Sequence, residues 1–170
     1  MFFLVPIETK IIIEPCNLNS RIDSYVYEKL IKKFEFKLHK KYGYIIKIKE
    51  IERITYPKVA NEGSGMIRVK FKALVFRPIK GEVVDGVVSI INKIAVYSKL
   101  GPVDAGVSRR CMPSTMKFNF DSYENHFVDK ESSAVIMKGE LLRFRIISVR
   151  IAENKFEVMG VINNDFLGPL

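Results

Sequence analysis

The sequence of 170 residues has little of the chemistry that enzymes and metal sites require. Its two cysteines, Cys16 and Cys111, form no CxxC pair and are too few for a disulfide scaffold, which favours a reducing compartment. Its two histidines, His39 and His126, have no cysteine or carboxylate partner at metal-ligand spacing. The carboxylates are scattered, and no segment presents two of them as an acid–base pair. We therefore expect no metal, no cofactor and no catalytic activity.

Long apolar runs are also missing. No stretch approaches the roughly 18 apolar residues that a membrane helix needs. The opening stretch, Met1–Ile7, lacks the basic start of a signal peptide and is followed at once by Glu8. Apolar residues make up 48% of the chain and charged residues 28%, a balance typical of a folded protein. We expect a folded protein with no membrane partner and no small-molecule substrate.

Positive charge is abundant, but only in one half of the chain. The formal net charge is +9. Residues 1–80 carry 17 basic and 8 acidic side chains, whereas residues 81–170 carry 11 of each. Eight lysines lie between Lys29 and Lys49; they form either a solvated helix face and strand edge or a field that attracts acidic protein or nucleic acid. The asymmetry predicts two units with different partners.

The first unit has the pattern of one helix and three strands. Apolar or alternating stretches predict strands over residues 2–13, bent or broken at Pro6, over 44–51 and over 66–76. A stripe with a spacing of about four predicts an amphipathic helix that ends near Lys41–Gly43: Ile22, Val26, Leu30, Phe34 and Leu38. Residues 56–65 are expected to form a loop. This order predicts an α+β sandwich, with the helix on one side of an antiparallel sheet.

Arg77–Pro78 is the expected joint between a first domain, residues 1–77, and a second domain, residues 78–170. Short strand-like runs punctuated by glycine follow it: 83–91, 94–100, 105–107, 135–137, 141–151 and 156–161. The polar stretch 119–133 is expected to be a loop inserted between strands. Five or so short strands in such a length predict an all-β barrel of the OB-fold type.

The expected barrel carries basic residues on either side of an aromatic ring. They are Lys93, Tyr97 and Lys99 near one strand, Arg109 and Arg110 after the next, and Arg143 and Arg145 on a later one. Single-stranded nucleic acid binds such a platform, because bases stack on the ring and phosphates pair with the cations. The alternative is that Tyr97 only covers the barrel and the arginines pair with neighbouring carboxylates. Both interpretations fit the sequence.

Several stretches resemble one family along the whole chain. The longest is Phe76–Val88, followed by Asn92–Lys93, Leu100–Pro102 and Val107–Pro113; shorter ones are Met1–Val5, Ile13–Pro15, Lys41–Tyr44 and Asp165–Gly168. They are similar to the stalk subunits of multisubunit RNA polymerases, the family of the seventh subunit of RNA polymerase II and of its archaeal counterpart. The resemblance departs from the family at Val59–Glu62, where a glycine-rich run is usual, and in the basic surplus of the first half.

The resemblance implies a truncated RNP-like N-terminal domain followed by an OB-fold barrel. It implies a nuclear, non-catalytic subunit that acts in transcription initiation and elongation, pairs with the fourth subunit and docks on the polymerase core near the clamp. Docking is implied for a tip that contains Tyr56, Pro57, Lys58, Gly63 and Gly65. The barrel is implied to contact nascent RNA, with Tyr97 at an aromatic position and Arg109 and Arg110 in a basic turn of the family.

A free-standing OB-fold RNA-binding protein is the alternative function, and the equivalent subunit of another nuclear or archaeal polymerase is a third. The surface of the first domain distinguishes a stalk subunit from a free-standing protein, since a subunit with an obligate partner exposes a large apolar face. Leu74 and Phe76 are expected on the otherwise charged face of the strand 66–76, where a solitary domain prefers polar groups. Their position favours a partner.

Overall fold

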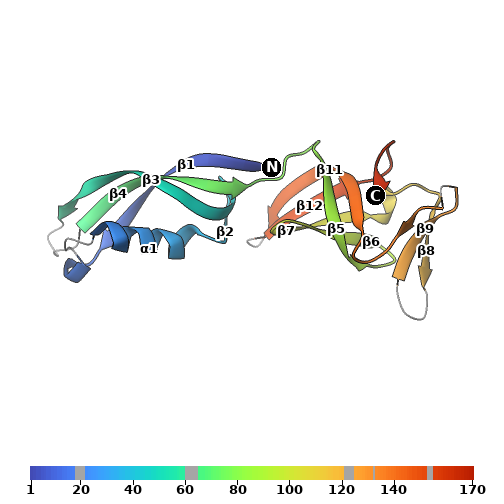
Figure 1. Cartoon of the computed structure of the whole chain (residues 1–170), viewed down its shortest axis with the longest axis horizontal. Coiled ribbons are helices and arrows are strands. Elements are labelled where there is room, and N and C mark those ends of the chain that lie inside the picture. The colour runs from blue at the N-terminus through green and yellow to red at the C-terminus, as the bar shows by residue number, and fades with distance from the viewer. Residues whose placement is uncertain (18–21, 60–64, 121–124, 132, 153–154) are drawn as a thin grey trace. The chain divides into compact units, whose positions relative to one another are not determined.

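The computed structural model describes residues 1–17, 22–59, 65–120, 125–131, 133–152 and 155–170. Its internal contacts divide the chain into two compact units, Met1–Arg77 and Pro78–Leu170. Both units are built mainly from antiparallel strands, and Figure 1 shows the helix α1 in the first unit. Among the described residues, no helix has the length and apolarity needed to cross a membrane.

The first unit is a four-stranded antiparallel sheet with a helix along one face (Figure 1). Its elements are β1 (Phe2–Ile13), a 3-10 turn η1 (Pro15–Asn17), α1 (Ile22–Phe34), β2 (Lys37–His39), β3 (Gly43–Val59) and β4 (Gly65–Phe76). The strands lie in the order β1-β4-β3-β2, so β1 is an edge strand and β4 is central. The layered α+β arrangement is the one predicted.

The core of this unit follows the periodicity of the sequence. Every second residue of β4 from Ile67 to Val75 is buried, as predicted for one face of a half-buried strand. The helix buries Val26, Leu30 and Phe34, three members of its predicted stripe. Phe34 and Phe71 contact each other with ring centroids 5.3 Å apart. The other face of the sheet is left without a covering layer from the described residues of this unit.

Three expectations for the first unit were wrong in detail. The helix ends at Phe34 rather than near Lys41, because Phe36 takes a positive φ of 55° and donates its N–H to the carbonyl of Ile45, which starts the short strand β2 with Leu38 in it. Strand β1 continues through Pro6, since an edge strand tolerates a residue with no N–H. Strand β3 runs on to Val59, and Gly65 begins β4, so the expected loop 56–65 is shorter; residues 60–64 lie outside the described ones.

The second unit contains a closed ring of five strands. Its strands are β5 (Val83–Ile91), β6 (Ala95–Leu100), β7 (Val103–Ser108), β11 (Leu141–Ala152) and β12 (Lys155–Val161), and the short β13 (Gly168–Pro169) joins β11. Each strand of the ring pairs with the next in the order β12-β7-β6-β5-β11, and β11 pairs back to β12. Only the β7–β12 pair is parallel.

A smaller sheet is attached to this ring. The 3-10 turn η2 (Arg109–Cys111) leads to β8 (Met116–Phe120) and β9 (Asn125–Asp129), which form a hairpin, and β10 (Val135–Ile136) pairs with β9. The expectation of a loop over 119–133 was therefore wrong, although residues 121–124 and 132 lie outside the described ones. The hairpin escaped detection because β9 buries only Phe127 and lacks a repeating apolar pattern.

Candidate functional site

A groove on the second unit is formed where β6, β7 and β12 lie side by side. It has a volume of about 690 Å³, and Tyr97 of β6 lies against it. The Tyr97 ring is 42% exposed, and Gly106 of β7 lies beneath it, so that a Cβ at Gly106 would be 3.4 Å from the ring atom Cε1. Phe156 and Met159 of β12 contribute further apolar surface. The groove therefore offers an aromatic ring and apolar neighbours on which a flat group can stack.

The charges that line this groove are mixed. Lys155 is the basic residue among its described lining residues, and Asp104 and Glu157 are the acidic ones. Lys99 follows Tyr97 on the same exposed face of β6, opposite Asp104 of β7. Lys93 is exposed in the turn before β6 rather than on the strand, as its spacing from Tyr97 had suggested. Binding of a polyanion at this groove thus depends on stacking at least as much as on charge.

The basic turn after β7 is held by an aromatic contact. The guanidinium of Arg109 lies over the ring of Phe127 from β9, with its Cζ 5.4 Å from the ring centroid. Its Nη1 atom is buried without a hydrogen-bond partner among the described groups. Arg110, the next residue, is exposed. Arg109 therefore packs on the hairpin while keeping an unused donor, and Arg110 presents its charge to solvent.

Two further cations lie close to each other on the hairpin. Lys117 of β8 and Lys130, just after β9, are exposed. The neighbouring Lys130 ammonium lowers the pKa of Lys117, and the charge of Arg109 adds to the effect. Sequence analysis did not select either lysine, since they are distant in sequence and only the pairing of β8 with β9 brings them together. Together with Arg109 they form a positive cluster.

Arg143 is engaged in an ion pair. Its guanidinium donates two hydrogen bonds to the carboxylate of Asp85 on the neighbouring strand β5, from Nε at 2.7 Å and from Nη2 at 2.8 Å. This bidentate contact lowers the pKa of Asp85 and raises that of Arg143. Neither Asp104 nor Glu140, which the sequence offered as carboxylate neighbours, is its partner. A phosphate that binds Arg143 has to compete with Asp85.

Arg143 and Arg145 line a second hollow, of about 470 Å³, on β5 and β11. Phe166 also lines it, with 96% of its surface exposed and a positive φ of 63°. This hollow shares no described lining residue with the groove at Tyr97. The predicted RNA-binding residues therefore fall into three places: Tyr97 and Lys99 on β6, Arg109 and Arg110 in η2, and the arginines of β11.

The predicted docking residues lie at one end of the first unit's sheet. The backbone of Tyr56, Pro57 and Lys58 belongs to the end of β3, and Gly65 is the first residue of β4, opposite Val59. Gly63 lies outside the described residues. The structure therefore places four of the five residues at the β3–β4 end.

The open face of this sheet changes character along its length. At one end the register aligns Phe2 with Phe76 and Leu4 with Leu74. Phe2 and Leu4 are 57% and 60% exposed, whereas Phe76, expected on this face, is buried under the edge of the Phe2 ring, with the ring centroids 5.2 Å apart. An apolar end formed by Phe2, Leu4 and the half-buried Leu74 thus interrupts an otherwise charged face, as the sequence predicted in part.

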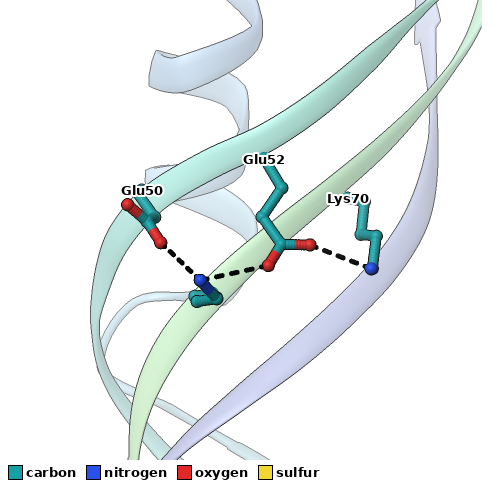
Figure 2. Close-up of polar contacts among 4 residues, drawn as sticks. Glu50, Glu52 and Lys70 are labelled. Carbon is teal, nitrogen blue, oxygen red and sulfur yellow. Dashed lines mark hydrogen bonds and ion pairs between the residues drawn. The ribbon is translucent and has the colours of Figure 1, made fainter.

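The middle of the open face carries a ladder of ion pairs. Figure 2 shows Glu50 and Glu52 of β3 reaching Lys70 and Lys72 of β4. Lys72 Nζ is 2.7 Å from Glu50 Oε1 and 3.2 Å from Glu52 Oε1, and Lys70 Nζ is 2.9 Å from Glu52 Oε2. Hydrogen bonds from both lysines lower the pKa of Glu52, and those to the glutamates raise the pKa of Lys72. The positive charges of this part are therefore largely neutralised.

The comparisons with known proteins agree with the sequence resemblance. Residues 8–65 match the family model described as the SHS2 domain found in the N terminus of Rpb7p/Rpc25p/MJ0397. The chain is 30% identical over 172 residues to the DNA-directed RNA polymerase II subunit rpb7 of Schizosaccharomyces pombe, a match that covers 99% of each chain. It is 28% identical to the subunit Rpo7 of Sulfolobus acidocaldarius, over 100% of this chain and 93% of the relative.

A further relative is the RNA polymerase IV subunit 7 of Arabidopsis thaliana, 32% identical over 137 residues, which cover 78% of this chain and 77% of the relative. No group of three or more metal-ligating side chains lies together among the residues that the structure describes. An aromatic groove, a positive hairpin and a sheet with an open, partly apolar face are features of a binding protein. With the end-to-end similarity, they lead to one conclusion: this chain belongs to the RPB7 family of RNA polymerase stalk subunits and functions in transcription.

Proposed function

We propose that this protein is a non-catalytic stalk subunit of RNA polymerase II in the nucleus. It pairs with the fourth polymerase subunit, docks on the polymerase core near the clamp and contacts nascent RNA during initiation and elongation. The observation that carries the proposal is the similarity to RNA polymerase II subunits over essentially the whole of both chains. The mechanism is one of binding: the N-terminal unit contacts protein, the C-terminal unit contacts the transcript, and no bond is made or broken.

Pairing with another subunit is supported by the apolar end of the open sheet face. Phe2 and Leu4 are exposed on the edge strand β1, beside the half-buried Leu74. Burying such side chains against a partner is favourable by about 25 cal/mol per Å² of apolar surface. We assign this end to the fourth subunit and the opposite β3–β4 end, with Tyr56, Pro57, Lys58, Gly63 and Gly65, to the polymerase core.

Contact with RNA is supported by the groove and the hairpin of the second unit. We propose that the five-stranded ring is an OB-fold barrel and that the Tyr97 ring stacks on a base of single-stranded RNA. Lys99, Arg110 and Lys93 are exposed and attract phosphates, and the Arg109 cluster extends the positive surface. Arg143 and Arg145 form a secondary contact, which Asp85 weakens at Arg143.

Affinity purification tests the assembly. A tagged full-length chain expressed in its native cells is expected to co-purify with the fourth subunit and the large subunits of polymerase II. Replacing Phe2 and Leu4 by serine is expected to release the fourth subunit, because polar side chains oppose burial, while matched serine substitutions at the exposed Tyr27 and Phe36 are expected to retain it. Recovery of this chain without any polymerase subunit would instead identify a free-standing RNA-binding protein.

RNA binding is tested by a salt titration with a labelled single-stranded oligouridine. Tyr97→Ala with Arg110→Gln is expected to weaken binding by about tenfold and to flatten its dependence on salt. The matched control, Ile94→Ala with Lys138→Gln, removes an exposed apolar side chain and one positive charge elsewhere on the unit. Equal affinity of both variants at every salt concentration rejects the site.

A second candidate is the equivalent subunit of another polymerase. The identity of 32% to a polymerase IV subunit and 28% to an archaeal subunit favours keeping it. The same purification distinguishes the two, because the largest subunit that accompanies the chain identifies the polymerase.

A further inference from the structure

The open face of the first unit's sheet places like charges directly opposite each other. Lys10 of β1 is the register partner of Arg68 of β4, and Arg68 is in turn opposite Thr55 of β3. All three side chains are exposed. Directly opposed residues on one face of an antiparallel pair lie about 5 Å apart at Cβ, so two cations there repel each other and destabilise the sheet. Such a pairing opposes folding unless something compensates for it.

The described part of this unit supplies no compensating ion pair. None of Lys10, Arg53 and Arg68 forms an ion pair with a described acidic residue. The next pairs along the same face are different, since Lys70 and Lys72 are paired with Glu52 and Glu50 (Figure 2). The sheet therefore neutralises its cations in the middle of the face and leaves them unneutralised towards the β3–β4 end.

The uncompensated cations surround a hollow of about 510 Å³. Lys10, Arg53, Arg68 and Lys70 line it, and Glu8 is the acidic residue among its described lining residues. The remaining described lining residues are Thr55, Met66 and Val69. Four cations against one carboxylate produce a local positive field, and the concave shape concentrates it.

The composition of the hollow indicates the kind of anion it accepts. Its described lining residues include no aromatic ring, so a nucleic-acid base has nothing on which to stack, in contrast to the groove at Tyr97. Arginine side chains such as Arg53 and Arg68 bind carboxylates through two parallel hydrogen bonds. Met66 and Val69 add apolar surface for the methylene groups of a peptide side chain. These features favour an acidic peptide.

We propose that this hollow binds an acidic segment, rich in Asp and Glu, of a protein partner. Carboxylates of the partner supply the counter-charges that Lys10, Arg53 and Arg68 lack. The surplus of positive charge in residues 1–80 then has a specific role, because its uncompensated part gathers at the end of the sheet where Thr55 precedes Tyr56 and Met66 follows Gly65. The inference rests on the proposed docking function in so far as this end is assigned to the polymerase core.

The test measures binding of a labelled peptide of alternating Asp and Glu to the full-length chain by fluorescence anisotropy. We expect saturable binding at low salt that the matched peptide of Asn and Gln does not show. Lys10→Gln with Arg68→Gln is expected to weaken it by about tenfold, the loss of two charge-assisted contacts. The melting temperature of this variant is expected to be equal or higher, because the substitutions remove repulsion between opposed cations.

The matched control is Lys32→Gln with Lys40→Gln. It changes the net charge equally, at exposed positions of α1 and of the turn before β3. Equal weakening by both variants, a lower melting temperature of the Lys10–Arg68 variant, or absence of peptide binding overturns the inference. Tighter binding of oligouridine than of the acidic peptide at this hollow, judged by the same variants, overturns it in favour of nucleic acid. Polymerase co-purification of the Lys10–Arg68 variant is measured separately, so a failed peptide site leaves the stalk function standing.

Discussion

The two units bury their cores in different ways, and the difference determines where each can bind a partner. The first unit has one sheet and one helix, so one face of the sheet remains open from Phe2 to Met66. The second unit closes five strands into a ring, so its core is enclosed and its candidate sites are a groove and an attached hairpin. An open sheet suits a broad protein partner, whereas a groove with one exposed ring suits a single strand of RNA.

The distribution of charge sharpens this contrast. The positive surplus of the sequence lies in residues 1–80, and the second half is balanced. The unit proposed to bind RNA is therefore the neutral one, and the unit proposed to bind protein is the basic one. Net charge alone would have reversed the two assignments; the aromatic groove at Tyr97 and the absence of rings among the described residues of the hollow at Arg68 argue against that reversal.

The largest expected effect tests whether the two cores are independent. Phe71→Ala in the first unit and Phe144→Ala in the second each remove a fully buried ring, and each is expected to cost about 3–5 kcal/mol of unfolding free energy. Native-state hydrogen exchange, measured for each unit, reports where the loss occurs. We expect each substitution to lower protection only in its own unit. Loss of protection in both units by either substitution would contradict independent cores.

The next prediction concerns the close packing inside the ring. A Cβ added at Gly160 of β12 would lie 2.4 Å from Cδ2 of the buried Phe144 ring, so Gly160→Ala is expected to cost about 1–3 kcal/mol. The control is Gly106→Ala, whose Cβ would be 3.4 Å from the exposed Tyr97 ring and is expected to change stability by less than about 0.5 kcal/mol. Chemical denaturation measures both, and equal effects would argue against a closed, tightly packed ring.

A smaller effect is expected at the Arg143–Asp85 pair. Both side chains are 39% exposed, so Asp85→Asn is expected to cost at most about 1 kcal/mol at neutral pH. Because the pair lowers the pKa of Asp85, its stabilisation is present above the ordinary aspartate pKa of about 3.9 and is lost as the pH falls through the lower, folded value. Unfolding free energies of both proteins should therefore converge in acid. A difference that persists below the folded pKa would assign the effect to packing.

The same substitution also sharpens the RNA assignment. Asp85→Asn releases Arg143 from its bidentate carboxylate partner while leaving the groove at Tyr97 unchanged. If Arg143 forms a secondary RNA contact, oligouridine binding should strengthen a few-fold at low salt, because a phosphate no longer competes with Asp85. Unchanged affinity would remove Arg143 from the RNA surface.

The smallest effect is expected on the hairpin. Lys130→Gln removes the cation that lowers the pKa of Lys117, so the Lys117 pKa should rise towards its usual value. An NMR titration of the lysine side-chain signals measures the shift, and Lys138→Gln, at an exposed turn residue, is the control with the same change of charge. No shift on Lys130→Gln would mean that the two ammonium groups do not approach each other in solution.

The sequence by itself determined the elements whose residues form a regular pattern. The alternation from Ile67 to Val75 identified β4, the spacing of Val26, Leu30 and Phe34 identified α1, and residues 83–91 were located correctly as β5. These patterns are local, because a buried face repeats every two residues in a strand and every three to four in a helix. Elements with a weak repeat, such as the β8–β9 hairpin, could not be found in this way.

Only the tertiary structure decided which side chains meet. Tyr97 shares a groove with Phe156 because β7 pairs in parallel with β12, Arg143 finds Asp85 across 58 residues of sequence, and Lys10 faces Arg68 through the register of β1 and β4. Strand order and register are set by how the whole hydrophobic surface is buried, and a shift of one residue would turn each of these side chains to the other face. The contacts that form the candidate sites therefore depend on the assembled sheets, even though each residue was visible in the sequence.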